Sequence, residues 1–265
     1  AASAASGHAV RAGDFRHCVN RTPPAMMTRP ATARIARWRT KETATMTIDY
    51  AKARAAMVEQ QVRPWDVLDP RVLETIARVP REAFVADAHR ALAYADLELP
   101  LGHGETMLKP VVEGRALQAL GLAPDESVLQ IGTGSGYLAA CLGYLARDVV
   151  SLERHADLAD AARSRLTAQG IANVDVVATD VFTWSTDRRF DAICVGAAAE
   201  TVPVGFLEWL RPGGRMFIVR GVAPAMEAVL VTRAGEGVNA PRIESLFETE
   251  LAYLAGAAPV PRFSF

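Results

Sequence analysis

Three glycines within five residues carry the strongest chemical signal in this chain. Gly132, Gly134 and Gly136 alternate with Thr133 and Ser135, after a short apolar run and before a segment with helical spacing. Glycine lets a chain turn sharply and approach a ligand closely, and the first N–H groups of a helix are free to donate hydrogen bonds. We therefore expect this glycine loop, residues 132–136, to hold a ligand at a strand-to-helix turn.

An acidic residue, Glu153, ends the next expected strand. In a βαβ unit this position lies beside the ribose of a bound nucleotide, where a carboxylate can accept hydrogen bonds from both hydroxyls. Dinucleotide enzymes favour the spacing G-x-G-x-x-G, whereas this loop reads G-x-G-x-G and is followed by Tyr137. The spacing is similar to that of class I methyltransferases, which bind S-adenosylmethionine. That resemblance implies that Asp180, after the third strand, contacts the adenine.

The segments that must position these residues alternate between strand and helix. From Pro124 onward, short apolar runs are separated by segments with helical spacing, a pattern that specifies a mostly parallel sheet covered on both faces. Two late strand-like segments without a helix between them predict that this doubly wound α/β sheet closes with an antiparallel pair. The expected strands are 127–131, 149–152, 174–177, 190–195, 215–219, 228–232 and 245–253, and the expected helices are 137–146, 155–169 and 204–210.

The chain before Pro124 is organised differently. Segments 49–61, 71–78 and 111–120 have helical spacing, and 99–110 is a loop rich in Gly and Pro. The first 45 residues hold eight basic and two acidic residues, a local net charge of +6, so the remainder of this chain of net charge −1 carries −7. Such a composition predicts a disordered basic tail. The tail is either similar to an organelle transit peptide or upstream sequence placed before a start at Met46.

Composition excludes several classes of partner. The net charge of −1 offers no basic excess for a nucleic acid, and no apolar run reaches the roughly 18 to 20 residues that a membrane helix needs. Cys18, Cys141 and Cys194 are widely spaced without a CxxC pair, so we expect neither a disulfide framework nor a metal site. We therefore expect a soluble cytoplasmic enzyme, for which the sequence sets no oligomeric state.

Ordered motifs extend beyond the glycine loop, from about Met57 to Gly221. They read MVEQQVR (57–63), RVL (71–73), VPREAFV (79–85), LAYAD (92–96), LPLGHG (99–104), VLQIGTGSGY (128–137), AAA (197–199) before VP (202–203), and LRPGGR (210–215). Together they resemble the signatures of the protein-L-isoaspartate O-methyltransferase family. The resemblance implies a seven-stranded methyltransferase sheet with an antiparallel last strand. It also implies a methyl acceptor that is the carboxylate of an isoaspartyl residue in a damaged protein or peptide, and hence a role in protein repair.

The loop expected near the methyl acceptor, residues 102–110, departs from the family pattern. The family's loop usually reads G-x-G-Q-T-I-S-Q-P, and this acceptor loop reads GHGETMLKP. Thr106 and Pro110 match, whereas Leu108 replaces the serine expected near the reacting carboxylate and Lys109 replaces the following glutamine. We expect three segments: a tail over 1–45, N-terminal helices and the acceptor loop over 46–110, and a Rossmann-like domain that binds S-adenosylmethionine over 111–265.

Two further departures lie on the cofactor side. Gln130 stands where the resemblance implies an acid at the end of the first strand, and Gly196 stands after the fourth strand, where the family often has Thr. The candidate cofactor-binding residues are the glycine loop together with Glu153, Asp180 and Gly196.

Methyl transfer to a carboxylate requires no proton abstraction, because the ionised oxygen is itself the nucleophile. Alignment and exclusion of water must then supply the acceleration. Three side chains are candidate catalytic residues that hold the acceptor: Thr106 through its hydroxyl, His103 through its imidazole and Lys109 through its charge. Each can also be an ordinary loop residue. The changes at positions 108 and 109 leave two other functions open: a methyltransferase acting on a different carboxylate or small molecule, and a non-catalytic cofactor-binding module that acts by interaction.

Overall fold

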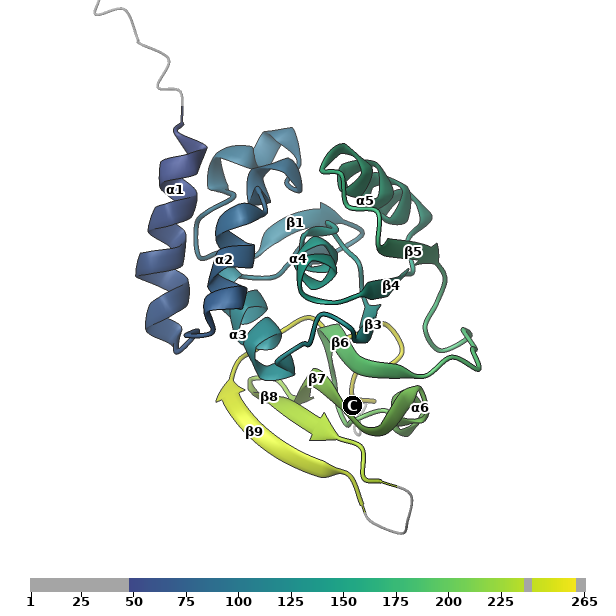
Figure 1. Ribbon diagram of the computed structural model, residues 1–265. Helices are drawn as coiled ribbons and strands as arrows, with labels where there is room; N and C mark the ends of the chain where they lie inside the picture. Colours follow the sequence, from purple (N-terminus) through teal and green to yellow (C-terminus); the bar gives the residue numbers. More distant parts are fainter. Residues whose placement is uncertain (1–47, 236–239, 261–265) are drawn as a thin grey trace, which may run out of the picture. The chain divides into compact units, whose positions relative to one another are not determined.

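The centre of the fold is a seven-stranded sheet in the order β5-β4-β3-β6-β7-β8-β9 (Figure 1). The structure, a computed structural model, describes residues 48–235 and 240–260, so the expected basic tail lies outside the described residues. The five strands β5, β4, β3, β6 and β7 are parallel to their neighbours in the sheet, and β8 is antiparallel to both β7 and β9. The strands are β3 (Ser127–Ile131), β4 (Asp148–Glu153), β5 (Val174–Ala178), β6 (Phe190–Ala199), β7 (Leu210–Val222), β8 (Ala225–Thr232) and β9 (Arg242–Glu248).

This arrangement confirms the predicted doubly wound sheet with an antiparallel carboxy-terminal part. The last strand differs from the expected 245–253, because its pairing with β8 begins at Arg242, opposite Thr232. The chain leaves the ladder after Glu248, and Tyr253 instead forms an isolated bridge with Ala198 in β6. Residues near the end of the described chain therefore return to the carboxyl ends of the central strands.

Helices cover both faces of the sheet (Figure 1). The N-terminal α1 begins after Asp49, whose side chain accepts a hydrogen bond from the backbone of Lys52, and continues through a π-helical turn. Asp69 caps α2 in the same way through the backbone of Arg71, with Pro70 in the first turn. The α-helices are α1 (Tyr50–Met57), α2 (Pro70–Arg78), α3 (Pro110–Leu120), α4 (Tyr137–Leu145), α5 (Ala156–Ala168) and α6 (Val204–Glu208), and the shorter turns are η1 (Val58–Val62), η2 (Arg63–Trp65), η3 (Arg81–Ala83) and η4 (Asp87–Leu92).

Successive residues of the central strands enter two different hydrophobic cores. In β3, Val128 packs into the core that also contains α2, α3 and α4, whereas Leu129 packs into the core on the other face, with Phe206 of α6. All five residues of β3 are buried. A parallel strand buried on both faces reads as a largely apolar run, and Val128, Leu129 and Ile131 give β3 this pattern in the sequence.

The segment expected to be an irregular loop contains a two-stranded hairpin. β1 (Leu99–Gly102) pairs antiparallel with β2 (Glu105–Met107). The turn between them, Gly102–His103–Gly104, has positive φ at all three residues, including +54° at His103. Such a conformation is accessible to glycine and uncommon for other residues. The two glycines therefore allow the hairpin that presents the acceptor loop.

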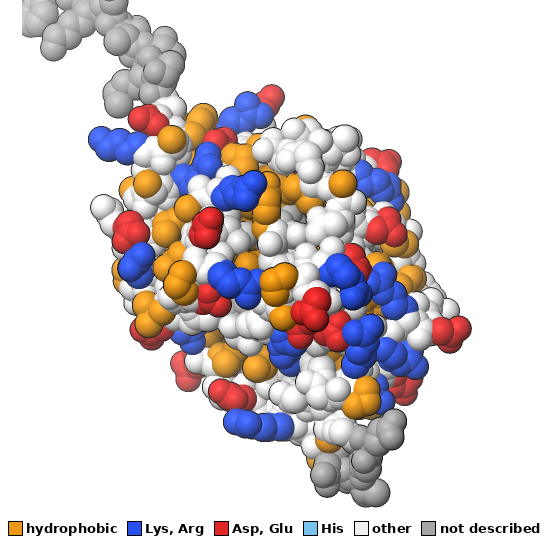
Figure 2. Space-filling model, viewed as in Figure 1, with side chains coloured by type: hydrophobic (Ala, Val, Ile, Leu, Met, Phe, Trp, Pro, Cys, Tyr) orange, Lys and Arg blue, Asp and Glu red, His pale blue; other side chains and the backbone are white. Residues whose placement is uncertain are grey.

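The face shown in Figure 2 carries Lys and Arg side chains interspersed with Asp and Glu. Ion pairs such as Arg188 with Asp148 and Arg211 with Asp191 join opposite charges across the surface. Among the helices of the described residues, none is both long and apolar enough to span a membrane. Over the same ranges, no group of three or more His, Cys, Asp and Glu side chains is arranged to hold a metal ion.

Candidate functional site

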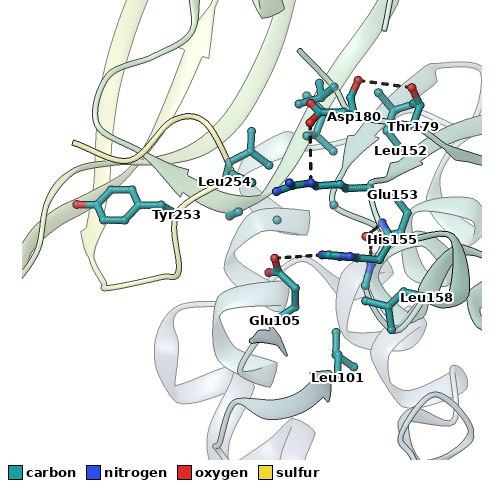
Figure 3. A pocket seen from close by; sticks show the side chains of 18 of the residues that line it. Leu101, Glu105, Leu152, Glu153, His155, Leu158, Thr179, Asp180, Tyr253 and Leu254 are labelled. Carbon is teal, nitrogen blue, oxygen red and sulfur yellow. Dashed lines mark hydrogen bonds and ion pairs between the residues drawn. The ribbon is translucent and has the colours of Figure 1, made fainter. Parts of the chain in front are cut away.

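A pocket opens at the carboxyl ends of β3, β4 and β6 (Figure 3). In the sheet, β4 lies on one side of β3 and β6 on the other, so the order of the strands reverses at β3. Open α/β sheets bind ligands where the strand order reverses in this way. The empty volume of this first pocket, counting the space that is open to solvent, is about 660 Å³. Its lining includes Gly132, Gly134, Glu153, Asp180 and Gly196, so the structure brings most of the predicted cofactor-binding residues together.

Glu153 and the glycine loop hold each other in place. The Gly134 N–H donates to Glu153 Oε2 at 2.8 Å, and the His155 N–H donates to Glu153 Oε1 at 3.0 Å. The side chain lies at the end of β4, and Glu153 is only 5% exposed. Each carboxylate oxygen has a second lone pair that can accept another hydrogen bond. Glu153 is therefore fixed by backbone groups and still able to accept from the hydroxyls of a ligand.

A buried polar network lies under the glycine loop. Gln130 Nε2 donates to the Gly132 carbonyl at 3.1 Å, and Gln130 Oε1 accepts from Ser151 Oγ at 3.0 Å. Ser151 Oγ is also 2.6 Å from Thr133 Oγ1. Sequence reasoning did not single out Ser151, although it directly faces Gln130 in the β3–β4 register. A neutral amide at position 130 can both donate and accept, so it satisfies this network without a charge.

Asp180 follows β5 and borders the same pocket. Its Oδ1 accepts from the Phe182 N–H at 2.9 Å, and its Oδ2 lies 3.9 Å from Arg154 Nε. Figure 3 shows Asp180 at the wall of the pocket, with Thr179 next to it, and Arg154 also lines this pocket. Arg154 was not predicted, but it follows Glu153 directly, at the start of the loop that leaves β4. The pair forms a polar end to the pocket, beyond Glu153.

Gly196 lies at an irregularity of β6, between Cys194 and Ala198. A Cβ atom at this position would stand 3.1 Å from the Gly132 carbonyl oxygen. A side chain here would therefore push against the backbone of the glycine loop. This close approach gives a physical reason for glycine where the family often has Thr.

A second pocket adjoins the first on the side of the acceptor loop. Five residues line both pockets: Leu101, Thr106, Gly132, Gly134 and Gly196. The second pocket adds residues from the acceptor loop, α3, β3, the glycine loop and α4, namely Met107, Leu108, Glu113, Gln130, Thr133, Ser135 and Leu138. Gly136, the last residue of the glycine loop, lines neither pocket. Of the three candidate acceptor residues, Thr106 is thus at the junction, while His103 and Lys109 line neither pocket. The Thr106 hydroxyl donates to Glu98 Oε2 at 3.2 Å.

His103 instead fastens the tip of the hairpin to the start of α5. Its Nε2 lies 2.9 Å from Asp157 Oδ2, and its ring stacks on that of His155 with centroids 4.1 Å apart and planes at 7°. His155 Nε2 is in turn 3.8 Å from Glu105 Oε1 (Figure 3). The hydrogen bond from His103 lowers the pKa of the Asp157 carboxyl below its usual value. The hairpin is therefore joined to the start of α5 by two contacts, one between His103 and Asp157 and one between Glu105 and His155.

A buried ion pair supports the acceptor loop from below. Arg81, which is fully buried, donates through Nη1 to Glu113 Oε2 and through Nη2 to the Leu108 carbonyl. Its guanidinium also lies over the Tyr137 ring, 4.8 Å from the centroid. Burial raises the pKa of Glu113 to about 7, although Arg81 opposes that change. Neither Arg81 nor Glu113 was predicted as a site residue. Arg81 lies in the VPREAFV motif and Glu113 in a segment with helical spacing, and neither pattern indicated a role in the site.

Comparison with known proteins gives consistent matches over most of the chain. A protein-family profile described as Protein-L-isoaspartate(D-aspartate) O-methyltransferase matches residues 52–246. A protein-L-isoaspartate O-methyltransferase of Syntrophus aciditrophicus is 40% identical over 198 residues, covering 74% of this chain and 91% of that protein. One of Koribacter versatilis is 41% identical over 189 residues, covering 71% and 85%.

Solved structures agree on the fold. A Plasmodium falciparum protein described as a protein-L-isoaspartate O-methyltransferase, in complex with S-adenosyl-L-homocysteine, superposes with a TM-score of 0.66 at 22% identity, covering 76% of this chain and 97% of that one. A second structure of that description gives a TM-score of 0.67 at 23% identity, covering 77% and 66%.

Proposed function

This chain belongs to the protein-L-isoaspartate(D-aspartate) O-methyltransferase family, and we propose that it transfers the methyl group of S-adenosylmethionine to the carboxylate of isoaspartyl residues in damaged proteins. The observation that carries the proposal is the junction of the two pockets. There the glycine loop and Gly196 meet Thr106 of the acceptor loop. Methyl donor and acceptor can therefore meet at residues that belong to both pockets.

The residues of the first pocket fit the cofactor. Glu153 is buried, ionisable and already aligned by two backbone N–H groups, so it can accept from the ribose hydroxyls. Asp180 and Arg154 offer polar groups at the far end, where the adenine would lie. A Cβ atom at Gly134 would stand 3.1 Å from the Leu101 side chain, so glycine keeps the loop close to the hairpin. Glycine loop, Glu153, Asp180 and Gly196 are thus the proposed cofactor-binding residues.

The chemistry follows from the charges of the two reactants. When bound, S-adenosylmethionine supplies an electrophilic methyl on a sulfonium: a carboxylate oxygen forms the new C–O bond as the C–S bond breaks, and a neutral thioether leaves. No proton moves, so the protein needs no general base. The protein contributes alignment and the exclusion of water. Apolar side chains of Leu101, Met107 and Leu108 line the approach, and the Thr106 hydroxyl is the proposed polar contact for the acceptor.

The roles of the other two candidate acceptor residues are narrower. His103 anchors the hairpin through Asp157 and His155, so we propose that it positions the acceptor loop. Lys109 precedes α3 and borders neither pocket, so we expect it to contact the part of a protein substrate that lies outside the pocket. Two unpaired buried cysteines, Cys141 and Cys194, fit a reducing compartment, and we place the enzyme in the cytoplasm.

A second candidate acceptor is a different carboxylate. Leu108 is 8% exposed and presents an apolar wall where the family has a serine. Loss of a hydroxyl lowers the number of donors available to an isoaspartyl carboxylate. An acceptor with fewer polar groups beside its carboxylate would fit this wall better.

The test is methyl transfer from labelled S-adenosylmethionine to a peptide that contains one isoaspartyl residue, with its normal aspartyl twin as control. We expect base-labile label in the isoaspartyl peptide alone. Equal labelling of the twin, or no labelling of either peptide by a chain that binds the cofactor, would contradict an isoaspartyl acceptor. In the second case, a panel of small carboxylic acids under the same conditions identifies the different carboxylate.

A further inference from the structure

The ion pair between Arg81 and Glu113 supports the acceptor loop, but support alone does not require two buried charges. Among the described residues, the charged side chains that are fully or almost fully buried are Arg81, Glu113 and Glu153. Glu153 has a role in holding the cofactor. Burying an ion pair costs desolvation energy, and replacement by apolar groups is often neutral or stabilising. The pair therefore calls for a function beyond packing, and Glu113 has access to one because it lines the second pocket.

We propose that Glu113 binds the α-ammonium group on the amino-acid tail of S-adenosylmethionine, and that the second pocket is the site of this tail. The inference rests on the proposed function. The first pocket offers Glu153 and Asp180 for the nucleoside, and it continues into the second through shared residues such as Thr106. A ligand with a nucleoside at one end and an amino acid at the other fills two adjoining pockets. Its sulfonium then falls at the junction beside the acceptor loop.

Charge decides which reactant occupies the second pocket. Glu113 is the one charged residue among those that line it. The methyl acceptor is a carboxylate, and two carboxylates in a poorly solvated site repel each other. The tail of the cofactor brings an ammonium group, which Glu113 attracts. Gln130 lines the same pocket at the position where the resemblance implies an acid. Its amide is neutral and is hydrogen-bonded to Gly132 and Ser151. The negative charge of this pocket therefore comes from Glu113 of α3.

The hydrogen bonds of Glu113 leave it able to take a second partner. Oε2 accepts from Arg81, and the structure gives Oε1 no hydrogen-bond partner among the described residues. The titratable neighbours are Arg81 from η3, Tyr137 and Cys141 from α4, and Cys194 from β6. Burial raises the pKa values of the tyrosine and both thiols, so these groups are neutral near pH 7. Arg81 is then the one charged neighbour of Glu113.

Two ligands distinguish binding of the amino-acid tail from binding of the nucleoside. S-adenosylhomocysteine carries the amino-acid tail, and 5′-methylthioadenosine keeps the nucleoside and the sulfur but lacks the tail. By calorimetry, we expect Glu113→Gln to weaken S-adenosylhomocysteine about 10-fold or more and to leave methylthioadenosine within about 2-fold. The matched control is Glu126→Gln, which removes a carboxylate paired with Arg215 at 2.7 Å, at the start of β3 and outside both pockets. We expect the control to change neither affinity.

The wild-type protein provides a test that needs no variant. Because burial raises the pKa of Glu113 to about 7, an ammonium partner would favour its ionised form and release a proton on binding. We expect the affinity for S-adenosylhomocysteine to fall between about pH 8 and about pH 6, while that for methylthioadenosine stays level. Proton release is measured in buffers of different ionisation enthalpy.

The outcomes separate this inference from the proposed function. Equal losses for both ligands in Glu113→Gln, or unchanged binding of both, overturn the role of Glu113 while the methyltransferase assignment stands. Parallel pH profiles for the two ligands in the wild type do the same. A wild type that binds neither ligand overturns the proposed function and this inference together.

Discussion

Two buried carboxylates show how differently the two sides of the site are built. Glu153 accepts from the backbone N–H groups of Gly134 and His155, which lie within the same strand–loop–helix unit. Glu113 depends on Arg81, which lies 32 residues earlier in the chain and in a separate 3₁₀ turn. The nucleoside end of the site is therefore assembled from local backbone geometry, and the second pocket from side chains that the fold brings together. A motif can predict the first kind of site but not the second.

Removing the carboxylate at the nucleoside end, Glu153, should have the largest effect. Glu153→Ala loses the hydrogen bonding of a charged acceptor, a total of about 1.5–3 kcal/mol, so we expect an affinity for S-adenosylhomocysteine roughly 10- to 150-fold weaker. Calorimetry measures it, and the far-UV circular dichroism of the variant should match the wild type. If the dissociation constant of a folded variant is unchanged, another group holds the ribose and the local model of this side is wrong.

In the second pocket, the pH dependence of stability should report on Glu113. Its pKa in the folded protein, about 7, lies above the usual value because of burial, so ionisation costs more in the folded than in the unfolded state. Stability should therefore fall as pH rises from about 4.5 to about 7, by an amount on the order of 2 kcal/mol. Glu113→Gln should flatten this part of the profile. Denaturant unfolding at several pH values provides the measurement, and identical slopes for variant and wild type would argue against a buried, weakly ionised carboxyl.

Glu126 provides the opposite case and a control for that experiment. Its hydrogen bond with Arg215 is the largest influence, and the pKa of Glu126 is lowered below its usual value. A lowered carboxyl pKa contributes stability that is present above the unfolded pKa and lost as pH falls through the folded value. Glu126→Gln should therefore alter the profile only below about pH 4.5.

Removing the hydroxyl at the junction should lower turnover and leave the cofactor in place. Thr106→Val keeps the shape of the side chain but removes one hydrogen bond, worth about 1–1.5 kcal/mol, so kcat/KM on an isoaspartyl peptide should fall about 10-fold. The affinity for S-adenosylhomocysteine should stay the same. Lys109→Ala is the matched control, since Lys109 borders neither pocket. A loss in the control equal to that in Thr106→Val would place the acceptor outside the junction.

Loosening the hairpin should produce the smallest effect. His103→Ala removes both the contact with Asp157 and the stack on His155. Because these groups are largely exposed, we expect a rise in peptide KM of only about 2- to 5-fold. Asp157→Asn should produce part of the same change, and the double variant should add little to His103→Ala. Strictly additive effects in this cycle would show that the two side chains do not act through one contact.

The sequence could predict the sheet because its strands are either buried on both faces or bounded by clear turns. It could place Glu153 and Asp180 at the first pocket, because one ends a strand and the other closely follows one. It could not predict the β1–β2 hairpin, whose strands are only four and three residues long. Nor could it place His103 against Asp157, 54 residues away. It could not identify Glu113 either, which reads as an ordinary polar residue of a helix that also contains Arg115 and Gln118.

The central claim is that the junction of the two pockets methylates an isoaspartyl carboxylate, and a competition experiment tests it most directly. An isoaspartyl peptide and its aspartyl twin, distinguished by mass, are mixed with the enzyme and S-adenosylmethionine in one tube. Mass spectrometry then gives the ratio of the two kcat/KM values from the methylated products. We predict a preference for the isoaspartyl peptide of about 100-fold or more, equivalent to about 2.7 kcal/mol. A ratio near one would contradict the account.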